Sequence, residues 1–503
     1  MNPIKADAKL PGLWYGILSI PVLLPILFPI YQWIKTGGYF FYQNAYDEYS
    51  YLSYEGALFK RGLVRPSEYL ICWLHEWGLS SGYINFMFDL ILAGAIALLL
   101  KEIFRRLGHD AKDAVFFTLM LFALPVLFGV SIGFYSKIFY WTLESNWIYW
   151  LALPESYSPP FYRTPDPQFS FLLICGAVLT FLRTRKFLFL YLAVPFLYIF
   201  IKVPYLFIVL SLHLWSLNKK YGWLNSRYAH AILAFLSYVV LSVAVGLYYQ
   251  FKIKGTLDAE FLTETRLPMV SGTFVVCLGI WWLLRKSFAD EKRRILGLIS
   301  FSPLMAVNTQ VISGFIAMPK NYEQYFGVLC FALLAAYWIA SLNAGRWLKT
   351  MQLVAAVLLI GVYTKTVFMV NSHPVLNNEI PAKLLIALQE DSPNVIFEDA
   401  ALGSTMSMVF PRQPFTGLAF SQSYDLGAFK YFQHYLCVKE KIRMKFSLSK
   451  KYEPVFKVLD HAYRHLHTDF IFVHINRPKK IRTFFDPQKR GVHCDSKPLF
   501  FYP

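Results

Sequence analysis

Apolar residues in this chain gather into long runs that are separated by short polar stretches. A helix needs about 20 predominantly apolar residues to cross the hydrocarbon core of a bilayer. The pattern therefore predicts an all-α polytopic membrane protein. Its clear spans cover residues 13–34, 83–104, 113–133, 168–182, 229–250, 270–286, 295–316, 325–343 and 350–370.

Residues 187–217 are apolar over a length that fits either one long helix or two short ones. Charge distinguishes between these readings, because short cytoplasmic loops carry an excess of Lys and Arg. The four basic loops all face the cytoplasm only if this region crosses the membrane twice. The turn would lie at "IKVP", since Pro204 disfavours a helical Val203, and Lys202 would reach the outer headgroups. We therefore expect eleven spans, a cytoplasmic N-terminus and a broken or re-entrant pair here. The basic loops are "KEIFRRLGHDAK", "RTRK", "NKKYGWLNSR" and "RKSFADEKRR".

An odd number of spans places the C-terminus on the outer side of the membrane. We expect a transmembrane domain over 1–370, in which the outer loop 35–82 contains juxtamembrane helices. A small outer domain of the α/β class follows over 371–503. Its strands are expected in "NVIF" and "DFIFVHI", and its helices in "AKLLIALQE" and "YEPVFKVLDHAYRHL".

The amino-acid composition is typical of a membrane protein and limits the classes of partner that we expect. Hydrophobic residues make up 56% of the 503 residues and charged residues only 16%, whereas soluble domains average about 25% charged residues. The net charge of +18 suits anionic lipid, phosphate or nucleic acid. Because most of the chain lies in the bilayer, we expect membrane lipids and lipid-linked phosphates as partners, and no nucleic acid.

Cysteine usage points to no metal site. Cys175, Cys277 and Cys330 fall inside apolar spans, where cysteine behaves as a small hydrophobic residue. A Cys437–Cys494 disulfide is compatible with an outer domain, although sequence does not fix it. No cysteine spacing resembles a zinc site.

Two adjacent carboxylates, Asp47 and Glu48, follow the first span in "YDEYSYLSYEGALFKR". Asn44 can cap a helix that starts here, and acids in the first turn of a helix suit its dipole. On such a helix Asp47 shares a face with Tyr51. Tyrosines favour the headgroup level, so loop 35–82 is expected to lie flat on the membrane and to hold the carboxylates over its outer surface.

This arrangement resembles the GT-C superfamily of integral-membrane glycosyltransferases, which includes the protein O-mannosyltransferases and the oligosaccharyltransferase catalytic subunit. Its members carry an acidic motif in a long first outer loop and take a sugar from a polyprenyl-phosphate carrier at the outer leaflet. The resemblance covers the first span, loop 35–82 and the layout of many spans followed by an outer domain. It implies a glycosyltransferase with a lipid, glycan or protein acceptor. The bacterial inner membrane is the expected location, with a periplasmic C-terminal domain, although an endoplasmic reticulum enzyme would share the layout.

Sugar transfer from a polyprenyl phosphate needs a base for the acceptor hydroxyl and cations for the leaving phosphate. We assign Asp47 as the base and Glu48 as the group that positions or tunes it. Phosphate binding is assigned to three cations that are expected at the outer ends of separate spans: Arg163, Lys202 and Lys320. Because the acids are adjacent rather than spaced as DxD, no cofactor is expected. A divalent metal is possible but not implied.

Three further polar side chains are assigned to substrate binding: Tyr51, Asn308 and Gln310. Each assigned residue also has a purely structural reading. Asp47 could be an exposed acid at a helix N-terminus, and Arg163, Lys202 and Lys320 could anchor their own helices in the headgroups. Asn308 and Gln310 could simply bond neighbouring helices within the membrane.

Two other classes of function fit the same pattern. A lipid or polysaccharide transporter, including a flippase, would show charged or broken helices near the middle of the bilayer. A non-catalytic subunit would keep the fold and use loop 35–82 for docking. The placement of the charged candidates toward the outer face favours surface chemistry over transport.

Overall fold

The computed structural model describes residues 66–79, 81–140, 149–151, 161, 166–226, 228–253, 262–285, 290–317 and 319–342, with isolated residues between 16 and 30 and between 353 and 361 and six short strands beyond 394. The chain divides into two compact units. The first comprises Met1–Leu27 and Phe88–Val370, and the second comprises Phe28–Met87 and Asn371–Pro503.

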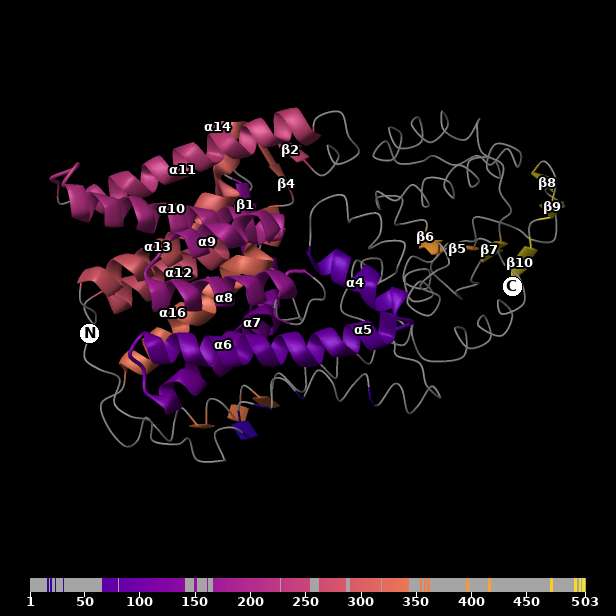
Figure 1. The fold of residues 1–503 in the computed structure, drawn as a ribbon. Coiled ribbons are helices and arrows are strands. Elements are labelled where there is room, and N and C mark those ends of the chain that lie inside the picture. Colours follow the sequence, from indigo (N-terminus) through magenta and orange to yellow (C-terminus); the bar gives the residue numbers. More distant parts are fainter. Residues whose placement is uncertain are drawn as a thin grey trace. The chain divides into compact units, whose positions relative to one another are not determined.

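Among the described residues, helices make up most of the first unit and of the second unit's part before residue 88 (Figure 1). In chain order they are α4 (Pro66–Glu76), α5 (Ser81–Met87), the π-helix η2 (Phe88–Leu92), α6 (Ala93–Arg106), α7 (Ala111–Tyr140), α8 (Gln168–Thr184), α9 (Leu188–Ala193), the 3₁₀-helix η4 (Val194–Phe196), α10 (Ile199–Tyr221), α11 (Ala229–Tyr248), the π-helix η5 (Tyr249–Ile253), α12 (Gly272–Leu284), α13 (Asp290–Val307), α14 (Thr309–Ser313), α15 (Pro319–Tyr322), the π-helix η7 (Glu323–Gly327) and α16 (Val328–Ser341). Short strands in the first unit are β1 (Tyr149–Leu151), β2 (Leu262–Glu264), β3 (Met269–Ser271) and β4 (Phe315–Ala317).

In the part of the chain that the structure describes, three helical stretches are long and apolar enough to cross a membrane: Ile199–Tyr221, Ala229–Phe251 and Glu323–Ser341. The prediction of a helical membrane protein is thereby confirmed at this level. The count of eleven spans remains a prediction.

Helix α11 shows how this membrane character is built. Its outward positions are apolar, with Phe235 60% and Val240 61% exposed. Its inward positions include Ser237 and Ser242, both buried, and each of the two serines follows the 3.6-residue period of the packed face. Polar groups therefore face the protein and apolar groups face outward, which is the arrangement that a hydrocarbon surrounding requires.

The region 187–217 folds as a short limb followed by a long helix, with α9 and η4 leading to a turn at Leu197 and Tyr198. The expected turn at "IKVP" is wrong: Val203 is helical and buried, and Pro204 lies inside α10. The turn is fixed instead by a hydrogen bond from the Tyr198 amide to Ser170 Oγ of α8, at 2.8 Å. Of the expected pair of short helices, only the first is short, since α10 has 23 residues. Whether the region crosses the membrane twice stays a prediction.

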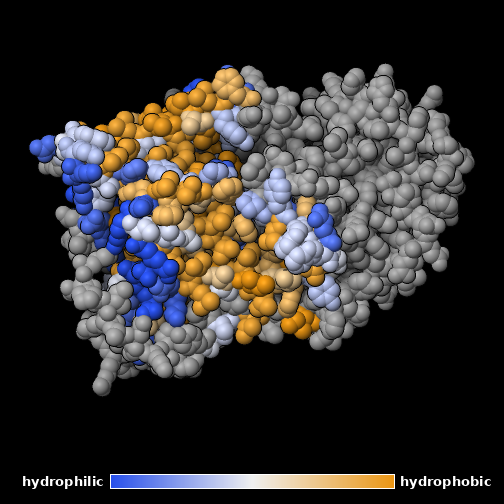
Figure 2. All heavy atoms as spheres, in the orientation of Figure 1, coloured by the Kyte–Doolittle hydropathy of each residue, from blue (hydrophilic) through white to orange (hydrophobic). Residues whose placement is uncertain are grey.

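The four basic loops meet at one end of the first unit. Lys219 of α10 forms an ion pair with Glu291 of α13 at 3.1 Å, and Phe187 stacks on His213 of α10. His109, between α6 and α7, bonds Tyr337 of α16 at 3.2 Å. Figure 2 shows hydrophilic residues at this end and hydrophobic residues over the middle of the helices. We call this the basic end.

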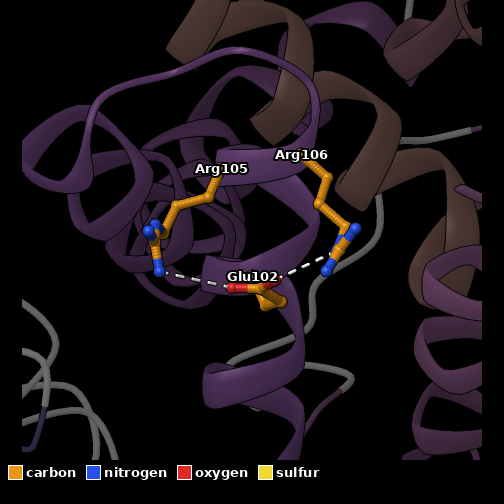
Figure 3. A network of polar contacts seen from close by, with 3 residues as sticks. All are labelled: Glu102, Arg105 and Arg106. Atoms are coloured by element: carbon orange, nitrogen blue, oxygen red, sulfur yellow. Dashed lines mark hydrogen bonds and ion pairs between the residues drawn. The ribbon is translucent and has the colours of Figure 1, made fainter. Parts of the chain in front are cut away.

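The last turn of α6 illustrates how the basic end balances its charge. Glu102 lies 3.0 Å from Arg106 and 3.5 Å from Arg105, at helical spacings of four and three residues (Figure 3). Cations in the last turn also suit the helix dipole. One carboxylate thus serves two guanidinium groups, and the loop keeps a positive charge.

His109 is held in an aromatic junction at the basic end. Its ring lies 4.5 Å from Phe117, and the Lys292 ammonium lies 4.5 Å from the centroid of Tyr337. Burial and the charge of Lys292 lower the pKa of His109 to about 4, and Asp110 opposes this shift. At neutral pH this imidazole is therefore uncharged.

We expect His109 to make stability fall with acid. Its folded pKa lies below the unfolded value, so its stabilising contribution is complete above about pH 6.5 and is lost as pH falls toward 4. Between pH 7.5 and 5.0 the loss is at most about 2 kcal/mol. Thermal unfolding in detergent at both pH values should show a smaller acid-induced drop for His109→Gln, which keeps a polar partner for Tyr337 but does not titrate. Equal drops in parent and variant would contradict this assignment.

In the second unit, short strands beyond residue 394 form a sheet with the order β10-β7-β5-β6, in which all pairs are parallel. They are β5 (Val395–Phe397), β6 (Phe415–Gly417), β7 (Ile471–Val473) and β10 (Phe500–Tyr502), and a separate pair is formed by β8 (His493–Cys494) and β9 (Lys497–Pro498). The expected strands in "NVIF" and "DFIFVHI" are present as β5 and β7. The expected helices 382–390 and 452–466 lie outside the described residues, so the α/β class of this region stays a prediction.

Candidate functional site

The end of the first unit that lies opposite the basic end contains its interrupted helices. Helices α10, α12, α13 and α16 each have one terminus among the basic residues, so Tyr198, Thr273, Asn308 and Glu323 lie toward the other terminus. There α13 breaks before α14, and α16 begins with a π-helical turn, a feature that is frequent at functional sites. We call this region the polar end.

Asn308 bridges the break between α13 and α14. Its Oδ1 accepts a hydrogen bond from the Met269 amide at 2.7 Å. Its Nδ2 donates to the carbonyls of Met269, at 2.7 Å, and Leu304, at 2.8 Å. Tyr238 of α11 donates its hydroxyl to the Asn308 carbonyl at 2.6 Å. A helix break within a membrane leaves backbone groups without helical partners. The Asn308 amide bonds one of them, the Leu304 carbonyl, and it also ties the break to the backbone of Met269 in β3.

Gln310 lies two residues further along and is fully buried. Its Nε2 donates to the Leu267 carbonyl at 3.0 Å, whereas its Oε1 receives no hydrogen bond within the described part of the chain. A buried acceptor without a donor costs about 1–3 kcal/mol. Gln310 therefore retains the capacity to accept a hydrogen bond from a hydroxyl or amide group.

Lys202 lies in the first turns of α10 and is half-buried. Its Nζ donates to the Pro195 carbonyl of η4 at 3.1 Å, which ties the short limb to the long helix. One turn earlier, the Tyr198 ring lies 5.8 Å from Tyr325 of η7. The start of α10 thus packs against η7, and it brings a cation to the polar end.

Glu323 is the first residue of η7 and is only 1% exposed. A Cβ placed on Gly327 would lie 3.1 Å from Glu323 Oε2 and 3.3 Å from the methyl group of Thr273. Glycine at this position therefore leaves room for the carboxylate, which extends toward the first turn of α12. A helix N-terminus favours negative charge.

Two more buried carboxylates lie at the polar end. Asp89 is 1% exposed and belongs to the π-helix η2, which packs against α8. Asp166 is 7% exposed and accepts a hydrogen bond from Ser170 Oγ at 3.0 Å, just before α8. Within the described residues of the first unit, all the buried carboxylates therefore occupy the end without the basic loops. Buried acids in membrane helices are costly and usually functional.

A second cation, Arg266, reaches the end of α14. Its Nη1 donates to the carbonyls of Val311, at 3.1 Å, and Ile312, at 3.0 Å. Strands β2 and β4 pair antiparallel beside it, and β1 pairs parallel with β3. This framework fixes the loop that carries Leu267 and Met269, the partners of Gln310 and Asn308.

Of the assigned site residues, the structure brings Asn308 and Gln310 together on the loop 267–269. Lys202 lies at the same end of the unit, on α10. Lys320 belongs to α15, but its side chain lies outside the described residues. Asp47, Glu48, Tyr51 and Arg163 also lie outside them. Glu323, in the stretch "NTQVISGFIAMPKNYEQYF", is a buried acid to which the sequence analysis assigned no role. Asp89 and Arg266 were not predicted as site residues either. An acid inside the apolar run "INFMFDLILAG" could have identified Asp89.

No protein-family model matches the chain, and none of the curated proteins matches it. In the described residues no three His, Cys, Asp or Glu side chains gather into a group that could hold a metal ion. The described side chains of the polar end are carboxylates, amides and cations. This set can hold a proton, accept hydrogen bonds from hydroxyl groups and neutralise an anion.

Proposed function

We propose that the chain is a membrane glycosyltransferase that moves a sugar from a polyprenyl-phosphate donor to a lipid, glycan or protein acceptor at the outer face of the membrane. The observation that carries the proposal is the polar end: buried carboxylates, two cations and the Gln310 acceptor all occupy the end of the first unit where helices are interrupted. The acidic pair after the first span, with its resemblance to the GT-C superfamily, supplies the class of reaction.

In this proposal Asp47 deprotonates the acceptor hydroxyl, and Glu48 positions or tunes it. Lys202, Arg163 and Lys320 neutralise the donor phosphate, which needs cations when it leaves water. Gln310 and Tyr51 bind hydroxyl groups of the substrate. The amide of Asn308 is already engaged by Met269 and Leu304, so Asn308 contributes by shaping the site. The region 371–503 is an outer α/β domain on the periplasmic side.

The orientation follows from the positive-inside rule. The basic end faces the cytoplasm and the polar end faces the periplasm of a bacterial inner membrane. This assignment matches the chemistry, because polyprenyl-linked sugars are used on the outer face in the superfamily that the chain resembles.

The orientation can be tested at Ser226, an exposed residue of the loop after α10. A cysteine introduced there should react with a membrane-impermeant thiol reagent only after the cells are permeabilised. A cysteine at Leu267, which is 42% exposed at the polar end, should react in intact cells. Both variants are compared with the parent chain, whose labelling measures the background reaction of the native cysteines. Labelling at Ser226 in intact cells would overturn the orientation.

A transporter of lipid-linked sugar is the second candidate, and specific observations favour it. The short limb α9–η4 and the α13–α14 break are discontinuous helices, and Asp89 and Glu323 are buried acids. Such features mark transport sites in many membrane proteins. A non-catalytic subunit with the same fold is the third possibility.

The deciding experiment uses the purified full chain in vesicles that contain polyprenyl phosphates carrying radiolabelled hexose or pentose, together with membrane extract as acceptor. A transferase releases free polyprenyl phosphate and moves the label into a new product. A transporter moves intact donor between leaflets without releasing polyprenyl phosphate. A protein that does neither with any donor of the panel would contradict both functions and leave the subunit role.

A further inference from the structure

Helix α10 extends past the α8–α9 turn at the basic end. Phe187, in the turn between α8 and α9, stacks on His213 with ring centroids 4.5 Å apart and planes inclined by 15°. From His213 the helix continues to Tyr221, which adds roughly 12 Å at 1.5 Å per residue. The tip of α10 therefore stands clear of the α8–α9 turn.

The turn after this tip is held in one conformation. Gly222 ends the helix with φ at +67°, a left-handed conformation that glycine adopts without steric cost. The Asn218 side chain accepts a hydrogen bond from the Leu224 amide at 2.7 Å and donates to the Leu224 carbonyl at 3.2 Å. This clamp stacks Tyr221 on Trp223, with centroids 5.6 Å apart and planes inclined by 8°. Both rings are more than half exposed.

One cation lies against this ring pair, and two more lie against Trp215, a buried ring of the same helix. The Lys219 ammonium lies 4.4 Å from the centroid of Trp215, and the Lys220 ammonium lies 4.9 Å from that of Tyr221. Arg294 of α13 approaches the same Trp215 ring at 5.6 Å. Among the described residues here, the acid that opposes them is Glu291, which bonds Lys219 and is itself 66% exposed. The surface therefore combines a net positive charge with exposed, preoriented aromatic rings.

We propose that this tip surface, formed by Lys219, Lys220, Tyr221, Trp223 and Arg294, binds the headgroup of an anionic phospholipid. Lys and Arg near an anionic leaflet contribute about 1 kcal/mol each, and Trp and Tyr rings favour the headgroup level. A dissolved phosphate would be bound by the cations alone and gives the exposed Tyr221–Trp223 pair no role. The pair suits a ligand that has both a phosphate and adjoining apolar chains, and it lies at the end of a helix that is long and apolar enough to cross the membrane.

The test uses the full-length protein in detergent, titrated with short-chain phosphatidylglycerol and, separately, phosphatidylcholine, with bound lipid counted by native mass spectrometry. The tip variant carries Lys219→Gln, Lys220→Gln and Arg294→Gln. The matched control carries Lys112→Gln, Arg183→Gln and Lys186→Gln, three cations of the same end that lie outside the tip surface. We expect phosphatidylglycerol to bind about tenfold or more weakly to the tip variant than to the parent or control. Phosphatidylcholine should not distinguish the three proteins.

Two further variants test the role of the aromatic rings and allow for a triple variant that does not fold. Tyr221→Ala with Trp223→Ala leaves every charge in place and should also weaken phosphatidylglycerol binding, whereas inorganic phosphate binding should not depend on it. Should the triple variant fail to fold, Lys220→Gln alone replaces it, with a smaller expected loss. Equal phosphatidylglycerol binding by tip variant and control would overturn the proposal. So would tip-dependent binding of a short oligonucleotide or of inorganic phosphate without any preference for phosphatidylglycerol.

Discussion

Replacing Asp47 by asparagine is expected to reduce sugar transfer by about 10²–10⁴-fold, because the acceptor hydroxyl loses its general base. The carboxamide has nearly the same shape as the carboxylate, so folding and membrane insertion should be preserved. The measurement is the release of polyprenyl phosphate from a defined lipid-linked sugar, normalised to the amount of folded protein.

Two further variants in the same loop serve as comparisons for Asp47→Asn. Glu48→Gln should cause a milder loss, since Glu48 positions or tunes the base. Glu55→Gln, in the same loop, should leave turnover near the parent value. Near-normal transfer by the Asp47→Asn protein would remove Asp47 from the reaction, although the polar end would still be available to a different base.

Replacing Asn308 by alanine should give the largest loss of stability. The Met269 amide and carbonyl would both lose a buried partner, and each such group costs about 1–3 kcal/mol when it is left unsatisfied. We expect a total loss of about 3 kcal/mol or more, measured as a lower thermal unfolding midpoint in detergent.

Asn225→Ala is the matched control for this change, since Asn225 is exposed in the loop after α10. It should leave the midpoint unchanged. If Asn308→Ala instead kept the parent midpoint but raised KM for the donor, Asn308 would bind substrate directly rather than shape the site.

The comparison of sequence and structure shows which signals are local. The apolar run predicted over 229–250 corresponds to α11 and η5, and 168–182 corresponds to α8, because hydrophobicity along the run suffices to define a buried or lipid-facing helix. The turn before α10 depended on tertiary contacts. Pro195 and Pro204 both indicate a possible turn in the sequence. The turn forms near Pro195, where the Tyr198 amide bonds Ser170 and Lys202 bonds the Pro195 carbonyl.

The site shows the same limit. The sequence predicts one continuous span over 295–316, and this is wrong, because α13 ends at Val307 and α14 begins at Thr309. At the break, Tyr238 donates a hydrogen bond to the backbone carbonyl of Asn308, and Met269 bonds the Asn308 side chain; both residues lie far away in sequence. Because Asn308 and Gln310 are polar residues within an apolar run, the sequence predicted them as site residues. The structural role of Asn308 at the helix break follows only from its contacts.

The short limb beside α8 has a consequence for the thickness of the surrounding bilayer. Helix α8 has 17 residues and spans roughly 25 Å, while α9 and η4 together rise only roughly 15 Å. Their outward residues are apolar, with Leu188 59% and Leu192 55% exposed. A hydrocarbon core of about 30 Å must thin to match this wall, at a cost of fractions of a kcal/mol per Å. We therefore expect the bilayer to be thinner beside α8 and α9, which would bring lipid headgroups closer to Lys202 than they would lie along a full-length helix.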